Sequence, residues 1–335
     1  MNLKELQTFC QDNGESAFRG SQLYEWMYRH GVDTIEEMSN LSQSFREKLS
    51  ENCSIQTLHV DRTNPSQIDQ SVKLLFRTLD QQFIETVSMV DGNRHTVCLS
   101  SQVGCALDCR FCATGEMGLT RNLTTGEIVD QLIYVRKHIA QPITNVVFMG
   151  MGEPFHNYEN VLNAADIFHD PKGFNLASTR ITISTVGLLP QIQQFIQENR
   201  RYKLAISLNA AFDKDRSKIM PVNKKWPIED LIHAGREYSN QKKRQVMFEY
   251  VLLKGVNDSE EDALELAGLL KNVECKINVI PYNEMGGEFT RPDTQTIEKF
   301  VNVLHKHRRG YRVLVRWSKG QDIAAGCGQL AGQTA

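Results

Sequence analysis

Short apolar, β-branched segments alternate with amphipathic segments of helical period from about residue 96 onward, and this alternation limits the fold more than any other feature of the chain. Such a pattern is typical of βα units around a parallel sheet. Six units are fewer than the eight of a closed barrel, so we predict an α/β fold with a partial (β/α)6 TIM-like barrel. Ligands of such barrels lie at the carboxyl ends of the strands. The predicted strands are 96–100, 145–150, 180–185, 202–208, 245–253 and 276–282, and the predicted helices are 124–138, 157–169, 190–198, 228–239, 259–271 and 294–307.

The barrel is expected to occupy residues 96–318, between an N-terminal extension and a C-terminal tail at 319–335. Residues 1–60 are predicted to form a small helical domain, because apolar residues recur there at helical spacing. Residues 61–95 are predicted to contain a polar linker at 61–71 and a β-hairpin extension with strands at 72–79 and 83–90. The candidate core of the helical domain consists of Phe18, Leu23, Trp26, Met27, Ile35, Met38, Leu41, Phe45 and Leu49.

Three cysteines follow the first predicted barrel strand in a C-x3-C-x2-C spacing, at Cys105, Cys109 and Cys112. A 4Fe-4S cluster normally takes four cysteines, so this loop would leave one iron open to an external ligand. The ligand best matched to the spacing is S-adenosylmethionine, whose sulfonium accepts one electron and splits to a 5'-deoxyadenosyl radical. A zinc-binding structural protein is the alternative interpretation, but no second Cys/His pair at zinc-knuckle spacing follows.

Eight cysteines occur in a chain without an apolar signal core or a stretch of the ~18 apolar residues needed to span a membrane. We therefore expect reduced thiols, a cytoplasmic location and no membrane partner. The net charge of -2 does not indicate a nucleic-acid partner. A local basic run at 305–320 is either a solvated face or a phosphate-contacting surface, and it contains Lys306, Arg308, Arg309, Arg312, Arg316 and Lys319 with Tyr311 and Trp317 between them.

Four separated motifs resemble the RlmN/Cfr family of radical S-adenosylmethionine RNA (adenine) methyltransferases, and its RlmN branch most. They are CLSSQVGC from Cys98 to Cys105, FIETVSMV around Glu85, the GMGEP turn at 150–154 and DIAAGCGQL around Cys327. The segments FRGSQLYEWMYRHGVDTIEEMSNLS, MPVNKKWPIEDL and FEYVLLKGVNDS add to the resemblance, which runs almost end to end.

The resemblance implies a role for each of three residues outside the cysteine loop. Cys327 would carry a methyl group taken from one S-adenosylmethionine, and a second molecule would supply the radical that abstracts hydrogen from this methyl, so that two are used per turnover. Glu85 would remove the proton from the attacked ring carbon. Cys98 would release the product by attacking the sulfur of Cys327, forming a transient disulfide. The implied cofactor contacts are Gly152, Glu153, Ser184, Ser207, Leu208, Asn209 and Asn283.

Four residues depart from the family pattern. Asn209 replaces the usual histidine after Ser-Leu, and Ser318-Lys319 with Gln321 departs from the usual Thr-Arg-Gly-Asp-Asp run. These departures affect the expected details of cofactor and substrate contact more than the expected chemistry.

The resemblance implies methylation of carbon 2 of an adenine in the 23S rRNA peptidyl-transferase centre, and of the adenine 3' of the anticodon in tRNA. A one-electron donor such as flavodoxin and a monomeric state are also expected, with the helical domain contacting RNA. Two alternatives remain open. One is Cfr-like methylation of carbon 8 of the same rRNA adenine, and the other is a radical enzyme acting on a small molecule.

Overall fold

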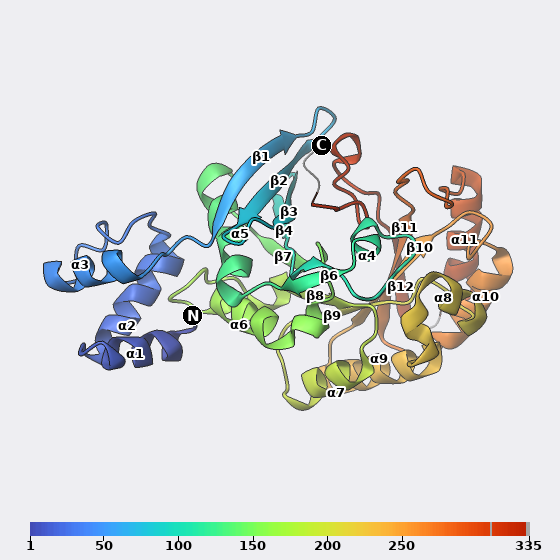
Figure 1. Ribbon diagram of the computed structural model, residues 1–335. Coiled ribbons are helices and arrows are strands. Elements are labelled where there is room, and N and C mark those ends of the chain that lie inside the picture. Colours follow the sequence, from blue (N-terminus) through green and yellow to red (C-terminus); the bar gives the residue numbers. More distant parts are fainter. Residues whose placement is uncertain (309, 333–335) are drawn as a thin grey trace.

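The computed structural model describes residues 1–308 and 310–332. Arg309 of the predicted basic run and residues 333–335 of the predicted tail lie outside the described residues. Three parts follow one another along the chain: helices α1 to α3, the antiparallel strands β1 to β3, and the large βα region that ends in the tail (Figure 1).

The βα region is built on consecutive parallel strands, and the predicted α/β partial barrel is confirmed. All six predicted barrel strands are present, and β12, which the sequence did not predict, adds a seventh beside β11. The sheet does not close, because β1 and β12 are its two edges. The parallel strands are β4 (Arg94–Cys98), β7 (Asn145–Phe148), β8 (Ile181–Thr185), β9 (Lys203–Ser207), β10 (Val246–Leu252), β11 (Cys275–Pro281) and β12 (Tyr311–Val315).

The parallel strands are connected by helices whose apolar faces pack against the sheet. Each of the six predicted helices is present within a few residues of its expected bounds, and the short α8 is an addition. The helices are α5 (Thr125–His138), α6 (Tyr158–His169), α7 (Leu189–Gln197), α8 (Asp213–Ile219), α9 (Ile228–Lys242), α10 (Glu260–Leu269) and α11 (Thr294–Lys306).

Three antiparallel strands extend the sheet before the barrel: β1 (Leu58–Pro65), β2 (Gln70–Thr78) and β3 (Phe83–Asp91). The predicted hairpin is therefore present as β2 and β3. The prediction of a linker at 61–71 is wrong except for residues 66–69, since residues up to Pro65 belong to β1 and residues from Gln70 onward belong to β2. Alternating exposure along β1 explains the polar sequence, because one face of an antiparallel edge strand is solvated.

The N-terminal helices α1 (Leu3–Asp12), α2 (Ala17–Tyr24) and α3 (Gln43–Asn52) lie to one side of the barrel (Figure 1). Most of the predicted core residues of this region are buried. Phe18 is the exception: it is 66% exposed, so its assignment to the core is wrong. Phe18 lies in the first turn of α2, where periodicity alone does not tell which face meets a neighbour.

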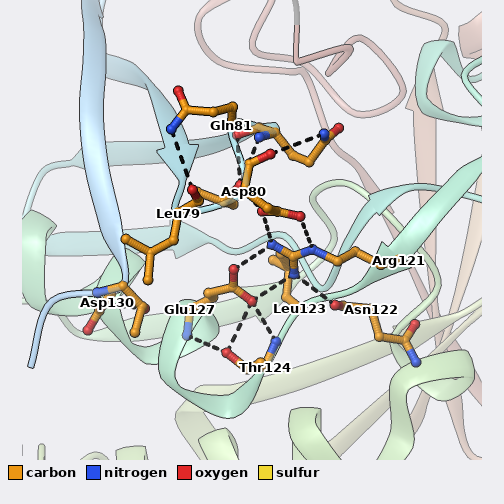
Figure 2. A network of polar contacts seen from close by, with 12 residues as sticks. Leu79, Asp80, Gln81, Arg121, Asn122, Leu123, Thr124, Glu127 and Asp130 are labelled. Atoms are coloured by element: carbon orange, nitrogen blue, oxygen red, sulfur yellow. Dashed lines mark hydrogen bonds and ion pairs between the residues drawn. The ribbon is translucent and has the colours of Figure 1, made fainter. Parts of the chain in front are cut away.

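A polar network joins the chain after the cysteine loop to the rest of the fold (Figure 2). Arg121 lies on β6 (Leu119–Asn122), which pairs with β5 (Gln102–Gly104) in a separate two-stranded sheet. Its guanidinium donates to Asp80 between β2 and β3 and to Glu127 in the first turn of α5, at 2.6–2.9 Å. The Arg121 guanidinium lowers the pKa of Asp80.

Among the helices within residues 1–308 and 310–332, none combines the length and the apolar composition that a membrane-spanning segment needs.

Candidate active site

A pocket with an empty volume of about 900 Å³ lies at the carboxyl ends of the parallel strands. It brings together nine of the predicted site residues from five segments of the chain. They are Cys105, Cys109, Cys112, Gly152, Glu153, Ser184, Ser207, Asn209 and Cys327. Four predicted site residues do not line this pocket: Glu85, Cys98, Leu208 and Asn283.

The backbone conformation of the cysteine loop depends on glycine at its entrance. Gly104 has a φ of 75°, and a Cβ there would lie 1.8 Å from the carbonyl oxygen of Gly118. The same oxygen accepts a hydrogen bond from the backbone N–H of Cys105 at 2.9 Å. The loop then ends in the short helix α4 (Ala113–Glu116), which starts directly after Cys112.

The donor set suits an iron–sulfur cluster. Burial raises the pKa of all three thiols, to about 12 for Cys105, and the neighbouring thiols contribute to the shift. Bound iron would offset this effect, because a metal ligand must be a thiolate. Among the described residues, no three His, Cys, Asp or Glu side chains converge on one metal ion. A cluster does not require such convergence, since its cysteines bind different irons.

Glu153 occupies the floor of the pocket, in the turn after β7. Its carboxylate accepts hydrogen bonds from the N–H groups of Phe155 at 3.0 Å and Val186 at 2.9 Å. Burial raises the pKa of Glu153 to about 7. Gly152, with a φ of 94°, packs against Gln102 so closely that a Cβ would lie 2.4 Å from the Gln102 Cβ. The turn thus presents a buried carboxyl group that suits an ammonium group of a ligand.

The ends of β8 and β9 carry Ser184 and Ser207 into the pocket, while the side chain of Leu208 is fully buried away from it. Asn209 adopts a φ of 58°, a conformation that asparagine tolerates better than most residues. Its side-chain oxygen accepts from the N–H of Val251 at 2.9 Å. Asparagine, which replaces the family's usual histidine at position 209, is therefore well suited to this backbone conformation.

Cys327 reaches the pocket on a segment that is held from two sides. The N–H of Ala113, next to the cysteine loop, donates to the carbonyl of Gly328 at 2.7 Å. The Asn283 side-chain amide donates to the carbonyl of Cys327 at 3.0 Å, and Gly326 packs against the same amide. The predicted cofactor contact Asn283 thus contacts the tail, although its buried Oδ1 has no partner in the described part of the chain.

Cys98 and Cys327 both line a second, adjoining pocket of about 420 Å³. Burial raises the pKa of the Cys98 thiol to about 12, and the charge of Arg316 opposes this shift. Arg316 lines both pockets, and its pKa is raised by Cys327, Glu249 and Cys98. The two cysteines that the sequence predicts to react with each other are therefore neighbours, with a guanidinium beside them.

Glu85 is buried on β3 and fully engaged. Its carboxylate forms an ion pair with Lys73 at 3.0 Å and accepts from the N–H groups of Ala331 and Gly332 at 2.8 and 3.2 Å. The residue predicted as a base thus contacts the tail just beyond Cys327 and does not line the main pocket.

Two family models match this chain: the radical SAM superfamily at residues 99–267 and the ribosomal RNA large subunit methyltransferase N-terminal domain at residues 1–55. The dual-specificity RNA methyltransferase RlmN of Desulfotalea psychrophila is 44% identical, with 98% of this chain and 92% of that protein covered. The enzyme of the same name from Syntrophotalea carbinolica is 43% identical, with 99% and 88% covered. This chain belongs to the RlmN family.

A crystal structure of a radical SAM methyltransferase from Sphaerobacter thermophilus resembles this fold with a TM-score of 0.94 at 42% identity, covering 99% of this chain and 98% of that one. Membership of the radical SAM superfamily implies a 4Fe-4S cluster and S-adenosylmethionine as cofactors. In this RlmN-family chain, the three cysteines of the loop suit the cluster, and the pocket that they line suits S-adenosylmethionine.

Sequence reasoning missed three polar residues of this RlmN-family site. Arg316 lies within the predicted basic run, where its neighbours are exposed. Glu249 lies within an apolar strand, and one of its buried carboxylate oxygens has no partner among the described residues. Arg216 lies in the charged helix α8, yet it is fully buried. Of the three, only Glu249 could have been found from the sequence, because a single charged residue within an apolar strand is unusual and indicates a functional position.

Arg216 is buried beneath the pocket and holds the backbone segments that line it. Its guanidinium donates to the carbonyls of Leu208, Ser207 and Val186 at 2.6–2.9 Å and to the side-chain oxygen of Asn223 at 2.9 Å. It therefore joins the loops that follow β8 and β9, which carry the predicted cofactor contacts.

Proposed function

We propose that this RlmN-family protein methylates carbon 2 of an adenine in the 23S rRNA peptidyl-transferase centre and of the adenine 3' of the anticodon in tRNA. The names of its relatives, which describe dual-specificity RNA methyltransferases, support RNA as the substrate class. The observation that carries the proposed chemistry is the placement of Cys327, which lines the same pocket as the three-cysteine loop and the next pocket together with Cys98.

The bound cluster and two molecules of S-adenosylmethionine would supply a methyl group and a 5'-deoxyadenosyl radical, with an electron from a donor such as flavodoxin. Cysteine rather than the base is the expected first methyl acceptor, because carbon 2 is an electron-poor amidine carbon that does not attack a sulfonium. Cys327, carried on the tail segment between Asn283 and α4, would present this methyl group to the radical and then to the base.

Cys98 would then release the product. Once the adduct has lost the ring proton and its unpaired electron, which the bound cluster would accept, the Cys98 thiolate attacks the sulfur of Cys327. An S–S bond forms, and the S–CH₂ bond breaks with its electron pair moving to the methylene carbon, which takes a proton to become the methyl group. The neighbouring guanidinium of Arg316 favours the thiolate, which burial disfavours. External thiols would reduce the disulfide.

Glu85 would accept the proton from the ring carbon. Its carboxylate is held by Lys73 and by the tail N–H groups of Ala331 and Gly332. The proposed role therefore requires the end of the tail to leave Glu85 when the base enters, and this exchange would couple base entry to exposure of the carboxylate.

The test is anaerobic reconstitution followed by reaction with 23S rRNA and tRNA transcripts and identification of the modified nucleoside by mass spectrometry. We expect 2-methyladenosine in both RNAs. Formation of 8-methyladenosine alone would replace this proposal with the Cfr-like reaction, and a preparation that binds only zinc would exclude radical chemistry.

Two variants test the roles of the cysteines. Cys98→Ala should accumulate a covalent protein–RNA adduct, because the releasing thiol is missing, and Cys327→Ala should form none. Cys53→Ala is the control, since Cys53 is a partly buried free cysteine distant in sequence from the site, and it should form product normally. Absence of an adduct with Cys98→Ala, despite an intact cluster, would remove Cys98 from the mechanism.

A further inference from the structure

A group of unpaired cations surrounds the amino ends of the parallel strands, at the end of the barrel opposite the active site. We call this group the basic mouth. Within residues 1–308 and 310–332, no carboxylate forms an ion pair with any of its members. The members are Arg94, Arg180, Lys203, Arg244, Lys276 and Arg312.

Strand register places four of these cations on the inner face of the sheet. Side chains alternate along a strand, so residues two or four apart share a face. Lys203 shares its face with Ser207, Lys276 with Ile280 and Arg312 with Arg316, and each of the latter residues lines the active-site pocket. Arg94 shares its face in the same way with Cys98, which lines the adjoining pocket. The four cations therefore face the interior of the partial barrel, about 13 Å from the pocket end of each strand.

The cations are also close to one another. Lys276 and Arg312 are direct partners in the parallel register of β11 and β12. Burial lowers the pKa of Lys203, and the charges of Lys276, Arg180, Arg94 and Arg244 lower it further. Like charges directly opposite each other destabilise a sheet. The arrangement therefore carries an electrostatic cost that no ion pair in the described part of the chain offsets.

Neutral hydrogen-bond donors accompany the cations. Thr182 is the register partner of Lys203, and Asn145 begins the neighbouring strand β7; both are only 7% exposed. The side-chain oxygen of Asn145 accepts from the hydroxyl of Thr144 at 2.9 Å, which turns its N–H₂ group away from that contact, and the hydroxyl of Thr182 lies on the same face of the sheet as Lys203. Cations beside hydroxyl and amide donors form the combination that binds phosphate oxygens in proteins.

We propose that the basic mouth is a second, non-catalytic site that binds phosphate groups, either those of a free phosphate compound or those of an RNA backbone. The inward-facing lysines Lys203 and Lys276 would contact the phosphate from the strands that carry them, and Thr182 and Asn145 would donate to its oxygens. Nothing in this site contributes a residue to the active-site pocket, so phosphate binding and methylation are separable.

The first experiment measures thermal unfolding of the protein in sodium phosphate or pyrophosphate against sodium chloride at equal ionic strength. Phosphate should raise the wild-type Tm by at least about 2 °C at saturation, because a ligand that binds only the folded state stabilises it. The double variant Lys203→Gln/Lys276→Gln should lose this shift. It should also be more stable than the wild type in chloride, because the repulsion is removed.

Lys4→Gln/Lys299→Gln is the matched control, since it makes the same change of charge at two exposed positions outside the basic mouth, on α1 and α11. It should retain the phosphate shift. The proposal is overturned if phosphate does not raise the wild-type Tm above the value in chloride, or if Lys203→Gln/Lys276→Gln keeps the full shift.

The second experiment distinguishes the sources of phosphate by measuring binding of a 23S rRNA fragment at several salt concentrations. If the RNA backbone occupies the basic mouth, the slope of log K against log[salt] should fall by about 0.7–0.9 for each lysine–phosphate ion pair that the double variant cannot form. An unchanged slope, together with disappearance of the phosphate shift in Tm, would assign the site to a free phosphate compound.

Discussion

Replacing Arg216 by methionine tests how the pocket is held together. The side chain makes four hydrogen bonds of 2.6–2.9 Å from a fully buried position, three of them to carbonyls of the β8 and β9 loops. Hydrogen bonds to a charged group contribute about 1.5–3 kcal/mol each before other effects. Burial opposes them by lowering the pKa of Arg216 to about 10, which corresponds to about 3 kcal/mol.

The hydrogen bonds therefore exceed the cost of burying the charge. Arg216→Met should lower the free energy of unfolding by about 3–5 kcal/mol, because it leaves buried carbonyls without a donor. Urea denaturation of the reduced protein without cofactors measures this change as a lower midpoint. Arg216→Lys should be intermediate, since an ammonium cannot reproduce the planar set of donors.

The control for this prediction is Arg236→Met on α9. Arg236 is exposed and contacts no partner among the described residues, so its replacement should change the free energy of unfolding by less than about 0.5 kcal/mol. A loss of less than about 1 kcal/mol for Arg216→Met would refute the reasoning, because it would mean that the burial cost and the hydrogen bonds cancel.

Three further predictions address pH, the cysteine loop and the N-terminal core. The raised pKa of Glu153 means that the protonated form stabilises the cofactor-free protein, so stability should fall as pH rises from about 4.5 to about 7, by roughly 3 kcal/mol, and Glu153→Gln should abolish this part of a pH–stability profile. Gly104→Ala should prevent iron incorporation, measured by iron content and absorbance, whereas Gly92→Ala, with open space around the new Cβ, should incorporate iron normally. Phe45→Ala should cost about 3–5 kcal/mol in urea denaturation, and an equal loss for the exposed Phe18→Ala would contradict the observed packing.

Local patterns predicted the fold well where one segment determines its own structure. Alternating apolar runs indicated the parallel strands and their helices, and the C-x3-C-x2-C spacing after β4 identified the loop that lines the pocket. Strand β12 was missed because Arg312 and Arg316 made its sequence look like a charged surface. At an open sheet edge, a strand needs few apolar residues, so composition does not reveal it.

The polar contacts of the site could not be predicted, because they join residues far apart in the sequence. Glu85 meets the tail across more than two hundred residues, and Asn283 binds the carbonyl of Cys327 rather than lining the pocket. Arg216 shows the same limitation, since a charged residue in a charged helix gives no indication that it is buried.

The tail crosses the gap between the two edges of the sheet. Asp322 accepts from the hydroxyl of Ser66 and the N–H of Gln67 at the turn after β1, and Gly320 donates to Asp69, whereas Cys327 is fixed on the other side by Asn283. Under the proposed function, the segment that would carry the methyl group therefore also spans the open side of the partial barrel. A mutation that weakens the contacts of this segment would change substrate access and the position of Cys327 together. Selection for substrate access and selection for reactivity would therefore act on the same short segment.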